Sequence, residues 1–164
     1  MKITKATRKA SEYACKLFHY SRTLPIVKES YNVFNDNDEW CGVIIYGPGA
    51  NKHIASPYQK WQGQVLELVR VALNGKQGHG NTSKALALTL KQIKKDEPLC
   101  ELIVSYADID QNHAGTIYQA TNWIYVGAVN EESRGAFVVH GVKMHPKSCH
   151  SKGWVQSLEW PRVS

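Results

Sequence analysis

Periodic apolar residues divide the chain into helices and strands. Residues 7–22 carry apolar side chains three and four positions apart, which predicts an amphipathic helix that ends before Pro25. A second helical pattern covers residues 82–95 and ends in a lysine-rich turn that suits the helix dipole. A short third helix is expected over residues 115–122.

Runs of β-branched and aliphatic residues predict the strands. Residues 65–73 form the most buried strand by pattern, with alternate apolar residues on both faces and one charge on each, Glu67 and Arg70. Buried charges are costly unless they are paired or used, so an internal ion pair, an edge position or a functional role is expected. Other strands are expected at 33–34, 41–46, 101–107, 124–129 and 136–144, followed by an irregular tail. Helices interspersed with strands indicate an α/β fold.

Length and charge limit the class of protein. The 164 residues suit one domain over 1–164, without an apolar run near the ~20 residues of a membrane span or a signal peptide at the start. We therefore expect a cytoplasmic protein, with four widely spaced cysteines as reduced thiols. The net charge of +6 suits a polyanion or an anionic cofactor, and plain solubility explains it equally well.

Polar side chains crowd the point where the strand at 101–107 ends and the next helix begins. Strand ends that feed helices are where open α/β sheets place their sites. Helix stabilisation alone does not require so many hydrogen-bonding groups, so a functional pocket is favoured over a structural cluster. The group comprises Ser105, Tyr106, Asp108, His113, Tyr118 and Asn122.

A glycine-rich turn joins the strand at 65–73 to the helix at 82–95. Gly75, Gly78 and Gly80 let the backbone approach a phosphate, next to a helix N-terminus with unpaired N–H groups. Lys76 and Lys84 add positive charge. The side chains that can cap the helix or donate hydrogen bonds are Asn81, Thr82 and Ser83. The spacing matches neither a Walker A motif nor GxGxxG, and an ordinary turn with a helix cap is the alternative.

Two further groups of side chains are candidates for catalysis or binding. His19, Tyr20 and Arg22 place an imidazole, a phenol and a guanidinium at the end of the first helix. Residues 145–164 form a basic tail whose cations and tryptophans suit nucleic acid, although a solvated tail that packs its tryptophans has the same composition. No strong zinc pattern fits the spacing of His140, His145, Cys149 and His150.

Several segments share their residues with one protein family. They are Glu67-Leu68-Val69-Arg70, Asn81-Thr82-Ser83-Lys84-Ala85-Leu86, Ser105-Tyr106-Ala107-Asp108, the block at 115–127 and the HisProLysSer at 145–148. Through these segments the chain resembles the Mom family of bacteriophage DNA-modification proteins over residues 8–150. The turn at 78–80 also resembles the Gly-x-Gly pyrophosphate loop of GNAT acyltransferases. Gly75 stands where those enzymes usually have a basic residue or glutamine.

The resemblance implies a GNAT-like fold, a mixed central sheet flanked by helices. It implies conversion of adenine in double-stranded DNA to N6-carbamoylmethyladenine, which protects the DNA from restriction in the host cytoplasm. The catalytic residues it implies are His19, Tyr20, Glu67, Tyr106, Asp108 and Tyr118. Acetyl-CoA is the expected cofactor, bound by Gly78, Gly80, Asn81, Thr82 and Ser83. DNA contacts are expected from Arg22, Lys143, Lys147 and Lys152.

The implied product raises a chemical problem. Its added group is joined through an sp³ carbon and ends in an amide, whereas acetyl transfer leaves an acyl group. This difference motivates the hypothesis of iron near His19, Asp108 or His113. Two other functions stay open: an ordinary GNAT N-acetyltransferase acting on a small molecule or protein, and a non-enzymatic nucleic-acid binder. The oligomeric state is not predicted.

Overall fold

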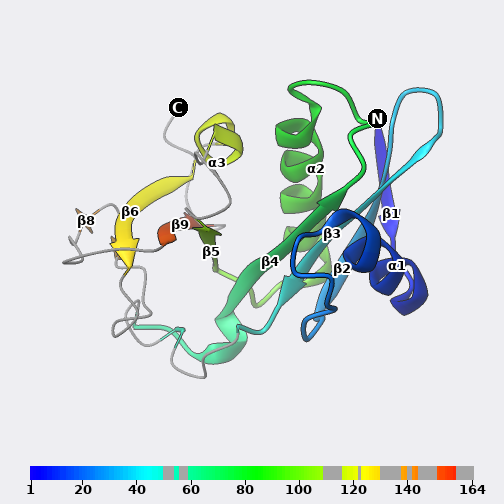
Figure 1. Ribbon diagram of the computed structural model, residues 1–164. Coiled ribbons are helices and arrows are strands. Elements are labelled where there is room, and N and C mark those ends of the chain that lie inside the picture. The colour runs from blue at the N-terminus through cyan, green and yellow to red at the C-terminus, as the bar shows by residue number, and fades with distance from the viewer. Residues whose placement is uncertain are drawn as a thin grey trace. The chain divides into compact units, whose positions relative to one another are not determined.

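The computed structural model describes residues 1–49, 54–55, 59–108, 116–121, 123–129, 138–139, 142–143 and 151–157. The chain, drawn in Figure 1, divides into two compact units. Unit 1 comprises Met1–Pro48 and Leu68–Pro98, and unit 2 comprises Gly49–Glu67 and Leu99–Ser164. No helix among the described residues is long and apolar enough to cross a membrane.

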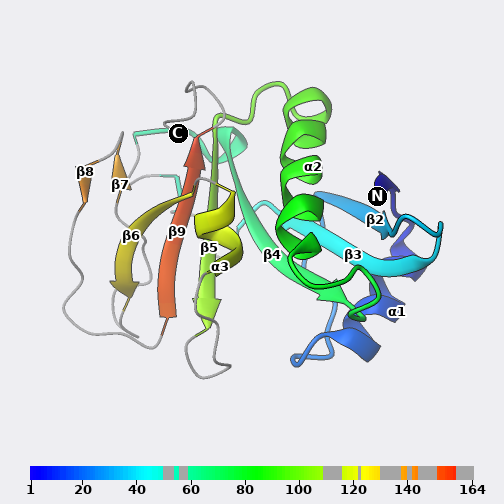
Figure 2. The ribbon, with the colours of Figure 1, turned by 90° about the horizontal axis from the view of Figure 1, so that it is seen from above.

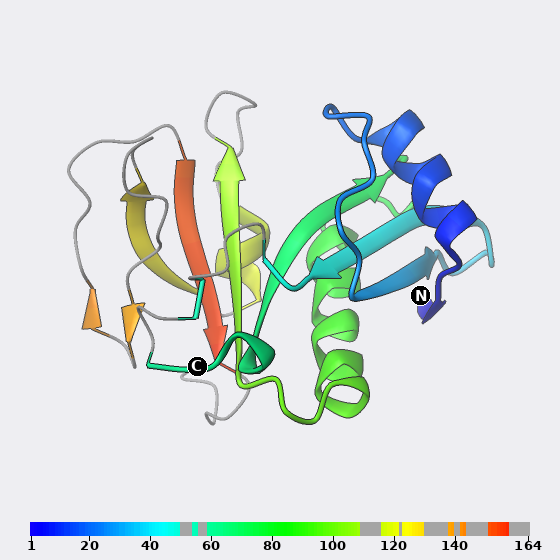
Figure 3. The same cartoon turned by 90° about the horizontal axis from the view of Figure 1, so that it is seen from below.

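Unit 1 is a layer of strands between two helices (Figure 3). The strand order is β1-β2-β3-β4, and both β1 and β3 run antiparallel to β2. The β4 strand begins in unit 2 and continues into unit 1 from Leu68. The elements are β1 (Lys2–Lys5), α1 (Arg8–Phe18), β2 (Glu29–Phe34), β3 (Trp40–Gly47), β4 (Val65–Leu73) and α2 (Asn81–Asp96).

The β3 strand is the core of unit 1 because helices cover both of its faces. Ile45 packs in one cluster with Ala14 and Cys15 of α1. On the other face, the Tyr46 hydroxyl lies 2.7 Å from the Thr89 hydroxyl of α2, and both side chains are buried. Seven of the eight residues of β3 are buried, whereas β4 is buried only in part. The prediction that residues 65–73 form the most buried strand is therefore wrong.

The β3 and β4 strands approach closely at Gly42. A Cβ atom at this residue would lie 2.0 Å from the backbone oxygen of Ala72, and its φ is +131°. Only glycine fits such an approach. Val69 and Ala72 pack against the same cluster, although strict alternation along a strand would place them on opposite faces. The predicted division of β4 into two regular faces therefore does not hold between these residues.

The helices differ in length from their predictions. The α1 helix starts after Thr7, whose hydroxyl accepts a hydrogen bond from the Ala10 N–H at 3.1 Å. It ends at Phe18 because His19 has an extended backbone, so the prediction of a helix over 7–22 is too long. The α2 helix agrees with the predicted 82–95 to within one residue at each end.

Unit 2 contains a three-stranded antiparallel arrangement. The β9 strand pairs with both β5 and β6, and lies between them in Figure 2. The elements are η2 (Gln62–Gln64), β5 (Leu102–Asp108), α3 (Thr116–Ala120), β6 (Ile124–Val129), β7 (Val138–Val139), β8 (Val142–Lys143) and β9 (Ser151–Ser157).

Two predictions for the C-terminal part are wrong. The β7 and β8 strands form a short antiparallel pair where one strand over 136–144 was predicted. The β9 strand lies in the tail predicted to be irregular. Most residues of β9 are polar or glycine, so it lacks the apolar alternation that marks a strand in the sequence. Its main-chain bonds to two neighbours define it instead.

The described cysteines are free thiols, as expected from their spacing. Cys15, Cys41 and Cys100 are buried. Burial raises the pKa of the Cys15 thiol, and the positive charge of Arg70 offsets part of that effect. Cys149 lies outside the described residues.

Candidate functional site

The glycine-rich loop before α2 holds three residues in the left-handed region. The φ angles of Gly75, Gly78 and Gly80 are +91°, +88° and +78°. Side chains rarely adopt such angles, which explains the three glycines. Gly80 is the N-cap of α2, and no side chain caps the helix there. The first turn of α2 therefore presents backbone N–H groups and the positive end of the helix dipole, a combination that binds anions.

Side chains next to the loop fix its shape instead of capping α2. The Asn81 amide donates to the Gln77 carbonyl at 2.6 Å, and the Gln77 amide donates to the Thr82 hydroxyl at 3.1 Å. Asn35, on the turn between β2 and β3, donates to the Lys76 carbonyl at 3.1 Å. The Gln77 side-chain oxygen is buried and has no partner among the described residues. The loop is thus held open by its own residues and by the neighbouring turn.

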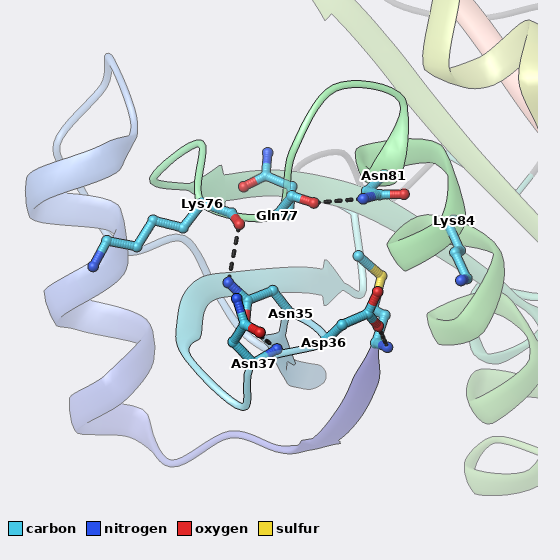
Figure 4. Close-up of a pocket in the computed structure, with 8 residues that line it drawn as sticks. Asn35, Asp36, Asn37, Lys76, Gln77, Asn81 and Lys84 are labelled. Atoms are coloured by element: carbon cyan, nitrogen blue, oxygen red, sulfur yellow. Dashed lines mark hydrogen bonds and ion pairs between the residues drawn. The ribbon is translucent and has the colours of Figure 1, made fainter.

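A polar pocket of about 180 Å³ lies between this loop and the β2–β3 turn (Figure 4). Lys76 and Lys84 supply positive charge at its edge, and Asp36 supplies negative charge. The Met1 amine hydrogen-bonds to Asp36 and lowers the pKa of that carboxyl. The other lining residues are Asn35, Asn37, Gln77 and Asn81. Two lysines near an uncapped helix N-terminus favour a phosphate over a cation.

The turn after α1 holds His19 in a defined orientation. Nδ1 of His19 accepts a hydrogen bond from the backbone N–H of Ser21 at 3.2 Å and lies 2.8 Å from the Ser21 hydroxyl. The imidazole stacks on the Tyr20 ring, with 4.4 Å between centroids. The Tyr20 side chain is about half exposed. Arg22 completes the turn with φ of +54°, and its N–H bonds to the His19 carbonyl at 3.1 Å.

A buried polar group in unit 2 contains Tyr118. Its hydroxyl lies 2.8 Å from the Ser105 hydroxyl, and both side chains are buried. Trp123 packs edge-on against the Tyr118 ring, with 5.2 Å between centroids. The indole N–H of Trp123 is buried without a hydrogen-bond partner among the described residues. Buried donors normally have partners, so the Trp123 N–H is a hydrogen-bonding group next to Tyr118 that no described residue satisfies.

The predicted site residues fall into two groups, one in each unit. Unit 1 holds His19, Tyr20, Arg22 and the glycine-rich loop with Asn81, Thr82 and Ser83, whereas unit 2 holds Glu67, Tyr106, Asp108 and Tyr118. In the structure the His19 ring stacks on Tyr20, and the Tyr118 hydroxyl is hydrogen-bonded to Ser105. Glu67 and Tyr106 are partly buried. Outside the described residues lie His113, Lys147, and the side chains of Asp108, Lys143 and Lys152.

The sequence patterns did not single out three side chains that contact these groups in the structure. The Ser21 hydroxyl lies 2.8 Å from Nδ1 of His19, Gln77 holds the loop, and Asn35 joins the loop to a turn 41 positions away. A serine two residues after a histidine gives a weak local signal, because serine often bonds to nearby backbone or side chains. Nothing in the sequence indicates the contact of Asn35, since it depends on strand pairing. Arg70 bonds to the Val69 carbonyl at 2.8 Å, and its Nε is buried without a hydrogen-bond partner among the described residues.

The iron hypothesis finds no support in the described part of the chain. No three histidine, cysteine, aspartate or glutamate side chains gather there as a metal site would require. The Nδ1 atom of His19 is already engaged by Ser21. Of the other two residues considered, His113 and the Asp108 side chain lie outside the described residues.

Comparisons with known proteins place this chain in a family. A model of the Mom protein family matches residues 1–163. Methylcarbamoylase mom of Escherichia phage Mu is 30% identical over 117 residues, which cover 67% of this chain and 46% of that protein. The chain thus spans about half the length of the curated relative it matches.

Solved structures identify the fold. A chimaeric spermidine N-acetyltransferase SpeG from Vibrio cholerae has a TM-score of 0.60 at 11% identity, with 96% of both chains covered. An aminoglycoside 6'-acetyltransferase of type Ii has a TM-score of 0.58 at 11% identity, over 99% of this chain and 100% of the other. At such identity the likeness shows the fold alone, which confirms the predicted GNAT-like α/β class. With the family match over nearly its whole length, the chain belongs to the Mom protein family.

Proposed function

We propose that this protein modifies N6 of adenine in double-stranded DNA with a carbamoylmethyl group and thereby protects the DNA from restriction enzymes. The observation that carries the proposal is the family match over residues 1–163. The phage Mu relative is named a methylcarbamoylase. The N-acetyltransferase fold supports group transfer to an amine, because its solved examples are enzymes of that kind.

Adenine must leave the base stack before it can react. Its N6 lone pair is delocalised into the ring, and within a duplex the amine is paired and enclosed. Tyr20 offers an exposed aromatic ring already stacked on His19, and this ring supports a flipped base by stacking. Arg22 adds a positive charge next to the same turn, in reach of a DNA phosphate. We therefore assign acceptor binding to the turn after α1.

Proton transfer is assigned to residues of unit 2. Glu67 is the proposed general base that takes the N6 proton, and Tyr118 the proposed proton donor to the leaving group. Ser105 holds the Tyr118 hydroxyl in position through the 2.8 Å hydrogen bond between the two groups. Tyr106 and Asp108 are proposed to orient the acceptor at the end of β5.

Acetyl-CoA is the proposed donor, with its pyrophosphate at Gly78, Gly80 and the start of α2. The uncapped start of α2 and the two nearby lysines support this role. Transfer of acetyl alone gives an amide at N6, whereas a carbamoylmethyl group is attached through its CH₂ carbon. A reaction that starts from acetyl-CoA therefore takes two co-substrates: ammonia, which replaces the CoA thiolate at the carbonyl carbon, and a two-electron oxidant, which takes up the two hydrogens lost when the CH₂–N6 bond forms.

Restriction analysis tests the proposal in cells. Plasmid DNA from cells that express the protein should resist enzymes whose recognition sites contain adenine, and DNA from cells with His19→Ala should be cut. Complete cutting of the DNA, with wild-type protein soluble and folded, contradicts the proposal. Acetylated polyamines or proteins in those cells would then point to an ordinary N-acetyltransferase.

A further inference from the structure

The outer face of α1 carries two lysines on either side of an exposed tyrosine. Lys9, Tyr13 and Lys16 are four and three residues apart, so they share one face of the helix. The opposite face, with Ser11, Ala14 and Cys15, is buried. Tyr13 is 56% exposed, and both lysines are exposed. This face is therefore largely exposed to solvent in the described part of the molecule.

The two lysines on this face form no ion pair with a carboxylate of the described residues. Arg8 forms an ion pair with Glu12 at 3.0 Å, and these two charges balance each other. Lys9 and Lys16 form no ion pair with a described residue. A helical rise of about 1.5 Å per residue puts their Cα atoms roughly 10 Å apart. Arg22, also exposed, continues the positive charge beyond the end of the helix.

The tyrosine between the lysines is held in place although it is exposed. Its ring contacts Phe18 edge-on, with 6.2 Å between centroids, and Trp40 at 5.8 Å. Leu17 and Tyr20 extend the exposed apolar surface toward the turn that holds His19. A fixed aromatic ring between two cations is suited to a nucleic-acid strand, in which phosphates alternate with sugars and bases. A membrane surface would require a much wider apolar face.

We propose that this α1 face, formed by Lys9, Tyr13 and Lys16, is a DNA-docking surface. Lys9 and Lys16 contact backbone phosphates, and Tyr13 packs on a sugar or base between them. This assignment rests on the proposed function, because DNA that follows α1 reaches the turn with His19 and Tyr20. It places DNA contacts on unit 1 in addition to the lysines expected near the C-terminus.

The test compares two double variants that lose the same charge. Lys9→Ala/Lys16→Ala changes the proposed surface, and Lys91→Ala/Lys94→Ala changes two exposed lysines on α2 that likewise form no ion pair with described residues. Binding to a fluorescent duplex of about 20 base pairs is followed by anisotropy from about 50 to 300 mM salt. The α1 variant should bind roughly 10- to 30-fold more weakly at physiological salt, and its log–log salt slope should fall by about two. The α2 variant should match the wild type within about twofold.

Two substitutions of Tyr13 test the ring itself. Tyr13→Phe retains the ring and its contacts with Phe18 and Trp40, so DNA affinity should be close to that of the wild type. Tyr13→Ser should lose about fivefold or more of the affinity with little change in salt slope. Thermal melting of all variants confirms that they are folded.

The possible outcomes distinguish a failure of the docking surface from a failure of the proposed adenine modification. Equal binding by the α1 and α2 double variants overturns the docking surface, as does a wild type that does not bind duplex DNA. If the α1 variant alone loses affinity but no modified adenine appears with the wild type, the surface stands and the proposed reaction fails. If DNA is modified and the α1 variant binds and modifies it like the control, the surface alone is wrong.

Discussion

The backbone N–H of Ser21 donates a hydrogen bond to Nδ1 of His19 across 3.2 Å. An imidazole nitrogen that accepts a hydrogen bond carries no proton, so the neutral ring has its proton on Nε2. Nε2 then acts as a hydrogen-bond donor, and the lone pair that a general base needs is turned to Ser21. This favours His19 as a group that orients the acceptor or stabilises developing negative charge, and leaves the base role to Glu67.

The tautomer can be observed directly. In ¹⁵N-labelled protein whose imidazole is in the neutral form, we expect Nδ1 of His19 to resonate as an unprotonated nitrogen and Nε2 as a protonated one. Ser21→Ala should keep this pattern, because the backbone N–H that donates to Nδ1 remains. A proton found on Nδ1 in the neutral ring would contradict the assignment and return His19 to the role of base.

The glycine-rich loop predicts a difference between two alanine variants. Gly80→Ala and Gly75→Ala both place a side chain at a left-handed φ, with open space around it, so each should cost about 1 kcal/mol of stability. Gly80 alone begins α2, where the pyrophosphate is proposed to bind. Calorimetry should therefore show weaker acetyl-CoA binding for Gly80→Ala than for Gly75→Ala. Equal affinities, or no binding by the wild type at millimolar acetyl-CoA, would remove the loop from the cofactor site.

Two variants separate a catalytic role of Tyr118 from a structural one. Tyr118→Phe and Ser105→Ala each break the 2.8 Å bond between the two buried hydroxyls, and each should lower the free energy of unfolding by about 1–2 kcal/mol. Only Tyr118→Phe removes the proposed proton donor, so it should reduce DNA modification at least about 100-fold. Urea denaturation and the modified fraction of adenine measure the two effects. Equal losses of activity in both variants would favour a structural role.

The contact between Tyr31 and Asp96 predicts a pH-dependent stability. Desolvation acts to raise the pKa of Asp96, but hydrogen bonds from Tyr31, Gln92 and Lys5 outweigh it and hold the pKa below its usual 3.8. A lowered pKa in the folded state stabilises the protein above pH 3.8, and this stability is lost as the pH falls through the folded value.

Tyr31→Phe removes the hydroxyl that donates to Asp96 at 2.7 Å. At pH 7 the variant should lose about 1.5–3 kcal/mol of stability, because a hydrogen bond to a charged group is lost. Urea denaturation at pH 7 and near pH 3 measures the difference from the wild type, which should shrink at the lower pH. A difference that stays constant would show that the hydroxyl does not act through the ionised Asp96.

The helices and most strands could be predicted because their periodicity is local. The α2 helix and β4 are the clearest cases. An apolar stripe runs along α2, and an apolar run makes up most of β4. The β9 strand could not be predicted, because its seven residues include only two large apolar ones, Trp154 and Val155. Its position depends on pairing with β5 and β6, which are distant in the sequence.

The candidate site, like the fold, could be predicted only where the signal is local in the sequence. The glycines of the loop were identified because left-handed φ angles select glycine, and the angles at Gly75, Gly78 and Gly80 agree. The Ser105–Tyr118 bond was not predicted as a contact, although both residues were singled out as part of the polar cluster. A one-dimensional pattern shows which residues carry chemistry, whereas their partners depend on how strands and helices pack.

Mass spectrometry of nucleosides tests the central claim most directly. DNA from cells that express the wild-type protein is digested to nucleosides, and DNA from cells with His19→Ala serves as the control. We expect a deoxyadenosine derivative heavier by one carbamoylmethyl group, with fragmentation that places the addition on the base, and its absence or strong reduction in the control. Only unmodified nucleosides, obtained with wild-type protein that is soluble and folded, would contradict the account.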